Sequence, residues 1–241
     1  MALNLPVSLP AAPPVRWQRR LARVVPHPRR APGAFLFVGV LVVGTTAVNR
    51  LDPRDADRLL AAISTDVSHL AAVPWLVLPA SALVITGTPL WLWAGALLVV
   101  LAPLEQRLGL RQAATVFLGG HVVATLLTEL PIAYAVAQGS WPDSALTRTD
   151  VGISYGFYAT VAAAAGLLPN RLRWAVLGGT AAVLVGQLAN DPDMSAAGHL
   201  IALGTGAGLD TVRRRLAPGR RPRLVPAVAG GWSVGRTTVD S

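Results

Sequence analysis

The 241-residue chain contains no cysteine and no lysine, and it has few charged residues of any kind. Without cysteine the protein can form no disulfide and has no thiolate to offer as a nucleophile or metal ligand. Charged residues make up 14% of the chain, against about 25% in a typical soluble domain. Hydrophobic residues make up 53%, which excludes an intrinsically disordered chain. This composition indicates an integral membrane protein.

Six stretches of the sequence are long and apolar enough to be considered as membrane spans. A spanning helix needs about 20 mostly apolar residues, with about 17 as a lower limit. The predicted spans are 32–48, 88–104, 112–136, 151–168, 174–189 and 196–212. The fold class expected from this pattern is an all-α bundle of six transmembrane helices.

One apolar run, 71–104, is too long for a single helix and is interrupted by Pro74, Pro79 and Pro89. It contains either two spans or one span preceded by a helix-and-loop segment in the membrane interface. Arginine is enriched on the cytoplasmic side of membrane proteins, and this bias decides between the two. Six spans place 17 of the 21 arginines inside, whereas a seventh span would place about 14 of them outside. We therefore predict six spans with both termini in the cytoplasm.

The same topology explains the net charge of +9. We expect three regions: a basic cytoplasmic tail (1–30), a membrane domain (31–212) and a second basic tail rich in proline and glycine (213–241). Positive tails next to a membrane domain set its orientation and are attracted to anionic lipid. The basic charge is therefore no sign of a nucleic-acid partner, and the expected partners are the lipid bilayer and other transmembrane proteins.

Polar residues within the predicted spans are the first candidates for function, because a bilayer makes them costly. Ser154 and His199 are the most informative of these, since both lie near the outer ends of their helices and at similar depth. A serine beside a histidine is the minimal pair for acyl transfer, with the imidazole taking the hydroxyl proton as the serine attacks a carbonyl. Gly152 and Gly198 flank the two residues and would allow close helix approach. The alternative is a structural role without catalysis, with the serine bonded to its own helix backbone and the histidine only packing. The other polar residues within the spans are His121, Glu129, Tyr155, Tyr158 and Gln187.

The order of these motifs resembles the rhomboid intramembrane serine proteases. The likeness rests on six spans, Gly-Ile-Ser at 152–154, Gly-His-Leu at 198–200, Leu-Glu-Gln-Arg-Leu-Gly at 104–109 and a long first loop at 49–87. It covers about residues 31–212.

The resemblance implies that Ser154 is the nucleophile and His199 the general base of an enzyme without metal or cofactor. It implies that Tyr158 packs on the histidine and that Ala202 and Gly206 make helix contacts. Glu105 and Arg107 would be structural. The implied substrates are single-span membrane proteins cut near the membrane surface.

Two departures from the family pattern concern the oxyanion hole. The family usually has a histidine and an asparagine on the second span, and here Pro89 and Trp93 stand at those positions. Neither supplies the usual donor, so the Ser154 N–H, Gln187 or Asn190 would have to replace it.

Tyr155 stands where a glycine usually follows the serine, and its ring would either fill space or cover Ser154. We expect Asp150 to cap the fourth helix, and His121 to pack far in depth from Ser154. Glu129 would bond a neighbouring helix or approach the site.

These departures leave three functions open. The first is a serine protease of the cell membrane with a Ser154–His199 dyad. The second is a catalytically impaired relative that binds transmembrane helices without cleaving them. The third is a small channel or transporter, for which Glu129 would be the clearest intramembrane acid.

Overall fold

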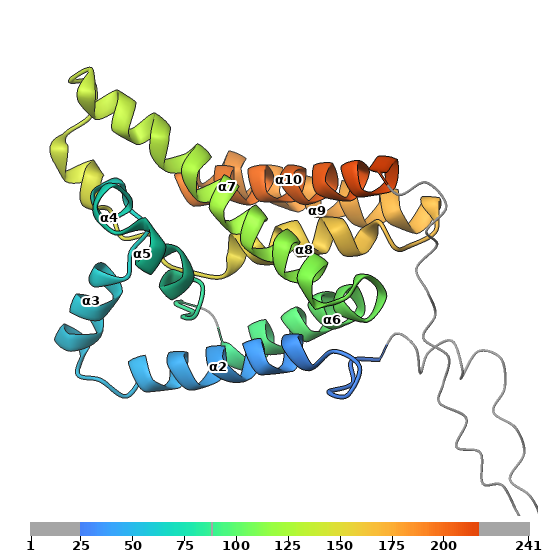
Figure 1. Ribbon diagram of the computed structural model, residues 1–241. Helices are drawn as coiled ribbons and strands as arrows, with labels where there is room; N and C mark the ends of the chain where they lie inside the picture. Colours follow the sequence, from blue (N-terminus) through green and yellow to red (C-terminus); the bar gives the residue numbers. More distant parts are fainter. Residues whose placement is uncertain (1–24, 88, 217–241) are drawn as a thin grey trace, which may run out of the picture.

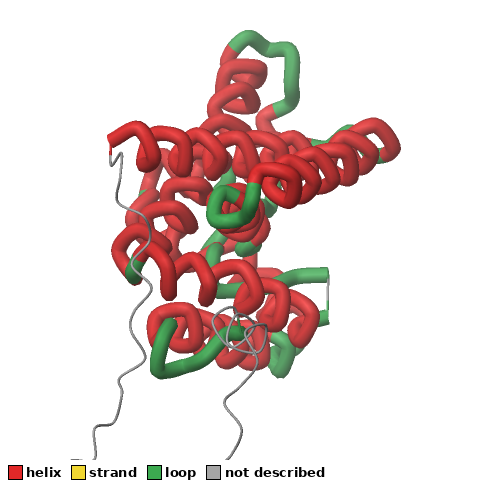
Figure 2. The backbone as a smooth tube through the Cα atoms, turned by 90° about the vertical axis from the view of Figure 1, so that its right-hand side faces the viewer, coloured by secondary structure: helices red, strands yellow, loops and turns green. Residues whose placement is uncertain are grey.

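The computed structural model describes residues 25–87 and 89–216, and within these ranges every regular element is helical (Figures 1 and 2). Most of the two predicted basic tails therefore lies outside the described residues. The elements are α2 (Pro32–Val48), α3 (Pro53–Ala62), α4 (Val67–Ala72), α5 (Pro74–Ser81), α6 (Leu90–Leu108), α7 (Leu110–Ala137), the 3₁₀-helix η1 (Asp143–Thr147), α8 (Ser154–Ala165), α9 (Asn170–Asn190) and α10 (Met194–Leu216).

Each predicted span coincides with one of these helices. The first, α2, has the predicted ends, and α6, α7, α9 and α10 differ from prediction by one to four residues at each end. Helix α8 is three residues shorter than predicted at each end, and it begins at Ser154 and not at position 151. The predicted span 151–168 would place Ser154 about one turn inside its helix, and the structure instead makes it the first residue.

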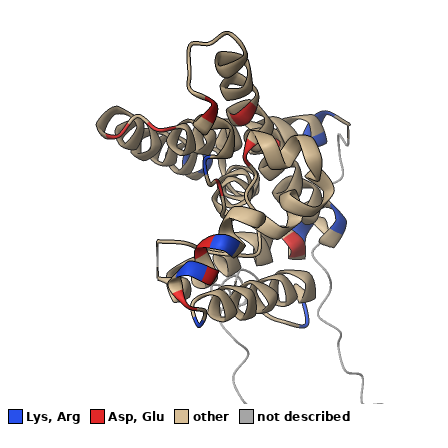
Figure 3. Cartoon of the chain, turned by 90° about the vertical axis from the view of Figure 1, so that its left-hand side faces the viewer, with Lys and Arg blue, Asp and Glu red and all other residues tan. Residues whose placement is uncertain are grey.

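Length and composition alone identify fewer spans than the sequence analysis. Among the described helices, only α7 and α9 combine the length and the mean hydropathy needed to cross a membrane, while α2 is apolar but shorter. The 12 residues of α8 extend only about 18 Å, against a hydrocarbon core of about 30 Å. Charged residues in Figure 3 lie mainly at helix ends and on α3.

The ambiguous run between the first and second predicted spans forms short helices and not a further span. The helices α4 and α5 contain six and eight residues and are separated at Val73. Neither is long enough to cross a bilayer. His121 of α7 contacts this segment. Its Nε2 lies 3.0 Å from the Leu78 carbonyl oxygen and 3.2 Å from Ser81 Oγ. The first loop is thereby attached to the middle of α7.

Helix α8 is the centre of the bundle and contacts α6, α7, α9 and α10 (Figure 1). Small residues make this close packing possible: Ala159, Ala162, Ala163 and Ala165 are buried along it. A side chain at Gly206 of α10 would collide with the Ala159 backbone, and one at Gly120 of α7 with the Ala159 Cβ. Membrane helices gain stability from such contacts because small residues let their backbones approach.

We predict that Gly206→Ala destabilises the protein by about 1–3 kcal/mol, because the new methyl group meets backbone that cannot move aside. Gly204→Ala is the matched control, since it lies on the same helix and a Cβ there has nothing within 4 Å. Its stability should be unchanged or slightly raised, because alanine favours helix over glycine. Thermal unfolding in detergent, followed by tryptophan fluorescence, measures both. Equal midpoints for the two variants would contradict the packing argument.

Glu105 connects α6 to the start of α2. The carboxylate is 5% exposed and accepts hydrogen bonds from the N–H groups of Gly33 (3.0 Å) and Ala34 (2.7 Å). No side chain of the preceding residue caps α2. Glu105 therefore satisfies N–H groups that have no partner within their own helix, and its charge suits the positive end of the helix dipole.

Candidate active site

The structure brings Ser154 and His199 together from two different helices. Ser154 is the first residue of α8, and His199 lies in the second turn of α10. The Ser154 Oγ lies 2.9 Å from His199 Nε2. This distance lets the serine hydroxyl donate to a neutral imidazole, which is the arrangement that activates a serine nucleophile.

The His199 ring lies against two tyrosine rings of α8. The centroid of the Tyr158 ring is 4.8 Å from that of His199 at an interplanar angle of 49°. The Tyr155 ring is 5.7 Å away at 67°. A Cβ at Gly198 would lie 2.5 Å from the Tyr155 ring, so glycine at this position makes room for Tyr155. The Tyr155 side chain is 3% exposed and fills the space between α8 and α10.

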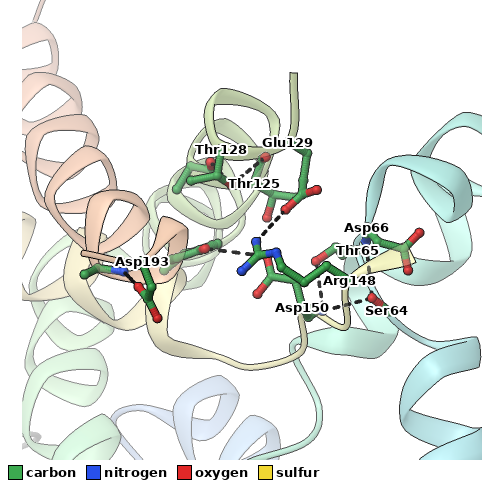
Figure 4. Close-up of polar contacts among 12 residues, drawn as sticks. Ser64, Thr65, Asp66, Thr125, Thr128, Glu129, Arg148, Asp150 and Asp193 are labelled. Carbon is green, nitrogen blue, oxygen red and sulfur yellow. Dashed lines mark hydrogen bonds and ion pairs between the residues drawn. The ribbon is translucent and has the colours of Figure 1, made fainter. Parts of the chain in front are cut away.

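The loop that leads into Ser154, residues 148–153, is bonded to the first loop and to α7 (Figure 4). The Thr65 N–H and hydroxyl both donate to the Asp150 carbonyl oxygen at 2.9 Å. The Asp150 N–H donates to Ser64 Oγ at 3.0 Å. Arg148 Nη2 donates to Glu129 Oε1 on α7 at 3.2 Å. The Asp150 backbone and the Arg148 side chain therefore hold this loop in place immediately before Ser154.

Asp150 does not cap α8, so that prediction was wrong. The N-cap residue is Ile153, and no side chain accepts the first N–H groups of the helix. The Asp150 carboxylate instead accepts a long hydrogen bond, 3.5 Å, from the Tyr155 hydroxyl. Burial raises the pKa of the Asp150 carboxyl above its ordinary value, and the nearby Arg148 opposes that rise. Gly152 takes a φ of 151°, a backbone conformation that favours glycine, and so supplies the bend between Asp150 and the helix.

The two positions that depart from the family's oxyanion motif have structural roles. Pro89 is the N-cap residue of α6, and its carbonyl accepts the N–H of Leu92 at 3.0 Å. Trp93 packs edge-to-face on Phe157 with 5.0 Å between centroids.

The first helical bond of α8 runs from the Phe157 N–H to the Ile153 carbonyl. The N–H groups of Ser154 and the next two residues therefore have no acceptor within the helix.

An open cavity of about 610 Å³ lies between the C-terminal end of α9 and the N-terminal end of α10 and reaches His199. Gln187 and Asn190, the two predicted alternative donors, both line it. The Asn190 amide nitrogen donates to the Gly186 carbonyl of its own helix at 2.7 Å, so that amide is already engaged. Asp193 also lines the cavity, and its Oδ1 accepts the Ala196 N–H at 2.6 Å, which caps α10.

Two polar residues of the third predicted span lie differently from expectation. His121 packs as predicted, but its ring centroid is 6.3 Å from that of Tyr155, so it is not remote from the serine's neighbours. Glu129 is 2% exposed and bonds Arg148 of the loop, not a neighbouring helix. His69 pairs with Asp66 at 2.7 Å in the first loop, away from His199.

Sequence reasoning missed Asp210, which is the most heavily paired carboxylate in the described residues. Its side chain is 1% exposed and lies 2.5 Å from Arg213, 2.7 Å from Arg214 and 3.9 Å from Arg173. Gly166 at the end of α8 packs directly on it. The spacing of an aspartate three and four residues before two arginines predicts ion pairs on one helix face. It gives no indication that Arg173 of α9 joins them.

Comparison with known proteins adds one finding. A family model described as "Rhomboid-like protein" matches residues 27–216. No curated protein and no solved structure matches the chain. The match covers every helix in the described ranges.

Proposed function

The chain belongs to the rhomboid-like family, a family of helical membrane proteins, and on that basis we propose that it is an intramembrane serine protease. Its substrates are single-span membrane proteins, cut near the outer surface of the cell membrane. The membrane domain crosses the bilayer six times with both termini in the cytoplasm. The observation that carries this proposal is the 2.9 Å contact between Ser154 Oγ and His199 Nε2 within a chain of this family.

The proposed reaction follows from the positions of these two residues. Ser154 Oγ attacks the scissile carbonyl while His199 Nε2 takes its proton. The resulting imidazolium gives that proton to the leaving amine as the carbon–nitrogen bond breaks, which leaves an acyl-serine. His199 then takes a proton from water, the water oxygen attacks the acyl carbon, and Ser154 recovers its proton. The open cavity beside His199 gives water a route to the site.

The start of α8 offers a replacement for the side-chain donors that the oxyanion hole lacks at Pro89 and Trp93. Because the first helical turn has no side-chain cap, its N–H groups and the positive end of the helix dipole remain available to a developing negative charge. The backbone N–H of Ser154 is the donor that we assign. Gln187, which lines the cavity that reaches His199, is the side chain that we assign to assist it. No role falls to Pro89 or Trp93.

The test is cleavage of a panel of single-span substrates in proteoliposomes, with labelling by a fluorophosphonate probe measured in parallel. Wild type should cleave and become labelled, and Ser154→Ala should do neither while unfolding at the wild-type temperature. Ser140→Ala is the matched control, because the Ser140 hydroxyl bonds the Ala135 carbonyl in an exposed turn and its removal should leave both signals unchanged.

A folded wild type that captures these substrates but neither cleaves them nor becomes labelled would overturn the protease assignment. The protein would then be a helix-binding relative without catalysis.

A further inference from the structure

In a catalytic triad a carboxylate holds the histidine by accepting a hydrogen bond from its second ring nitrogen. His199 has no such partner: its Nδ1 is buried without a hydrogen bond to any residue in 25–87 or 89–216. Apart from the bond between Nε2 and Ser154, the ring orientation therefore comes from packing. The rings beside it are Tyr158 and Tyr155.

Tyr155 has a feature that Tyr158 lacks, a bond to the loop preceding the serine. Its hydroxyl donates to Asp150 Oδ2 at 3.5 Å. Its ring is confined on the other side by Gly198, the residue next to His199. A rotation of the Tyr155 side chain would therefore move both the ring that contacts the imidazole and the hydroxyl that contacts Asp150.

Asp150 is itself held by the first loop. Its N–H and carbonyl bond Ser64 and Thr65, and these two residues are 0% and 1% exposed. Burying two hydroxyl groups is unfavourable unless they are bonded, and here Asp150 supplies partners for both. Figure 4 shows Ser64 and Thr65 beside Asp150.

We infer that Tyr155 is a positioning residue for His199, and that Asp150, anchored by Ser64 and Thr65, fixes Tyr155. This inference rests on the proposed function, since it assigns a way of orienting the proposed base. It assigns a role to Tyr155, which stands at a position where the resemblance leads one to expect glycine. It also makes the first loop part of the support of the dyad.

The experiment follows the His199 ring directly, so that it does not depend on activity. Full-length protein labelled with ¹⁵N-histidine is studied in detergent by nuclear magnetic resonance, with His199→Gln used to assign the ring signals. Tyr155→Phe removes only the hydroxyl, and Asp150→Ala removes its acceptor. Both should shift the His199 ring signals in the same direction. Tyr134→Phe, at an α7 position that is 69% exposed, is the matched control and should leave them unchanged.

Fluorophosphonate labelling then connects position with reactivity. Each single variant should lower the labelling rate about 2- to 10-fold, the effect of one modest hydrogen bond. The double variant should be slowed by less than the product of the two single effects, because both changes remove the bond between Tyr155 and Asp150. Thr65→Val should slow labelling, whereas Thr147→Val, which removes an exposed local bond, should not.

Unshifted His199 signals in Tyr155→Phe and Asp150→Ala would overturn the positioning role, and so would rate effects that multiply in the double variant. A wild type that is neither labelled nor active, but whose ring signals respond as expected, would remove the protease function and keep the positioning role. The two failures are therefore distinguishable.

Discussion

Replacing His199 by glutamine is expected to lower substrate cleavage by about 10³- to 10⁴-fold, in line with the loss of a positioned general base. Glutamine keeps a polar side chain of similar length but cannot take the Ser154 proton. The Nε2 of His199 is 2.9 Å from Ser154 Oγ, so no other described side chain is expected to replace it. Single-turnover cleavage in proteoliposomes measures the loss.

The pH dependence provides an independent check of the same prediction. Only the neutral imidazole accepts a proton, so wild-type labelling should fall as the medium becomes acidic and His199 takes up a proton. The residual rate of His199→Gln should lack this acidic loss. His121→Gln is the control, because His121 bonds the Leu78 carbonyl and has no part in the proposed chemistry. An acidic loss that persists in His199→Gln would assign the titrating group elsewhere.

Asp210→Ala is expected to destabilise the protein by about 3–5 kcal/mol. The carboxylate is 1% exposed and lies among Arg213, Arg214 and Arg173. Removing one partner of a buried ion pair leaves the other charge without compensation, which costs far more than the pair itself contributes. Thermal unfolding in detergent should show a large fall in the midpoint.

An exposed ion pair provides the matched control for this prediction. Asp55 pairs with Arg58 at 3.2 Å, with side chains that are 58% and 80% exposed. Asp55→Ala should change stability by less than about 1 kcal/mol, because exposed pairs contribute little.

Gly166→Ala should resemble Asp210→Ala, since a Cβ there would collide with the Asp210 carboxylate. Equal midpoints for Asp210→Ala and Asp55→Ala would contradict the assignment of Asp210 as the link between α9 and α10.

The sequence predicted the helices well because apolar runs in a bilayer-length window are a strong signal. It also predicted that Ser154 and His199 lie at similar depth, since both follow outer helix ends. Helix α8 was extended too far because Val151, Gly152 and Ile153 are as apolar as a span. In the structure they belong to a loop whose course is set by the bonds of Asp150 to Ser64 and Thr65.

Contacts between distant segments were the part that could not be predicted. Asp150 is placed correctly for a helix cap by sequence spacing, but its backbone bonds residues 85 and 86 positions away. The same applies to Arg173, which reaches Asp210 only because α9 and α10 pack side by side. Periodicity describes one element at a time, and these pairs depend on which elements become neighbours.

The bond between Glu105 and the start of α2 has a consequence for the order of events during synthesis. The two groups are 72 residues apart in the chain, so the ribosome adds the acceptor about 4 to 14 seconds after the donors, at 5 to 20 residues per second. During that interval the N–H groups of Gly33 and Ala34 have no Glu105 carboxylate to accept their hydrogen bonds. A nascent chain halted before Glu105 therefore has a complete α2 whose first N–H groups lack the acceptor that they have in the folded protein.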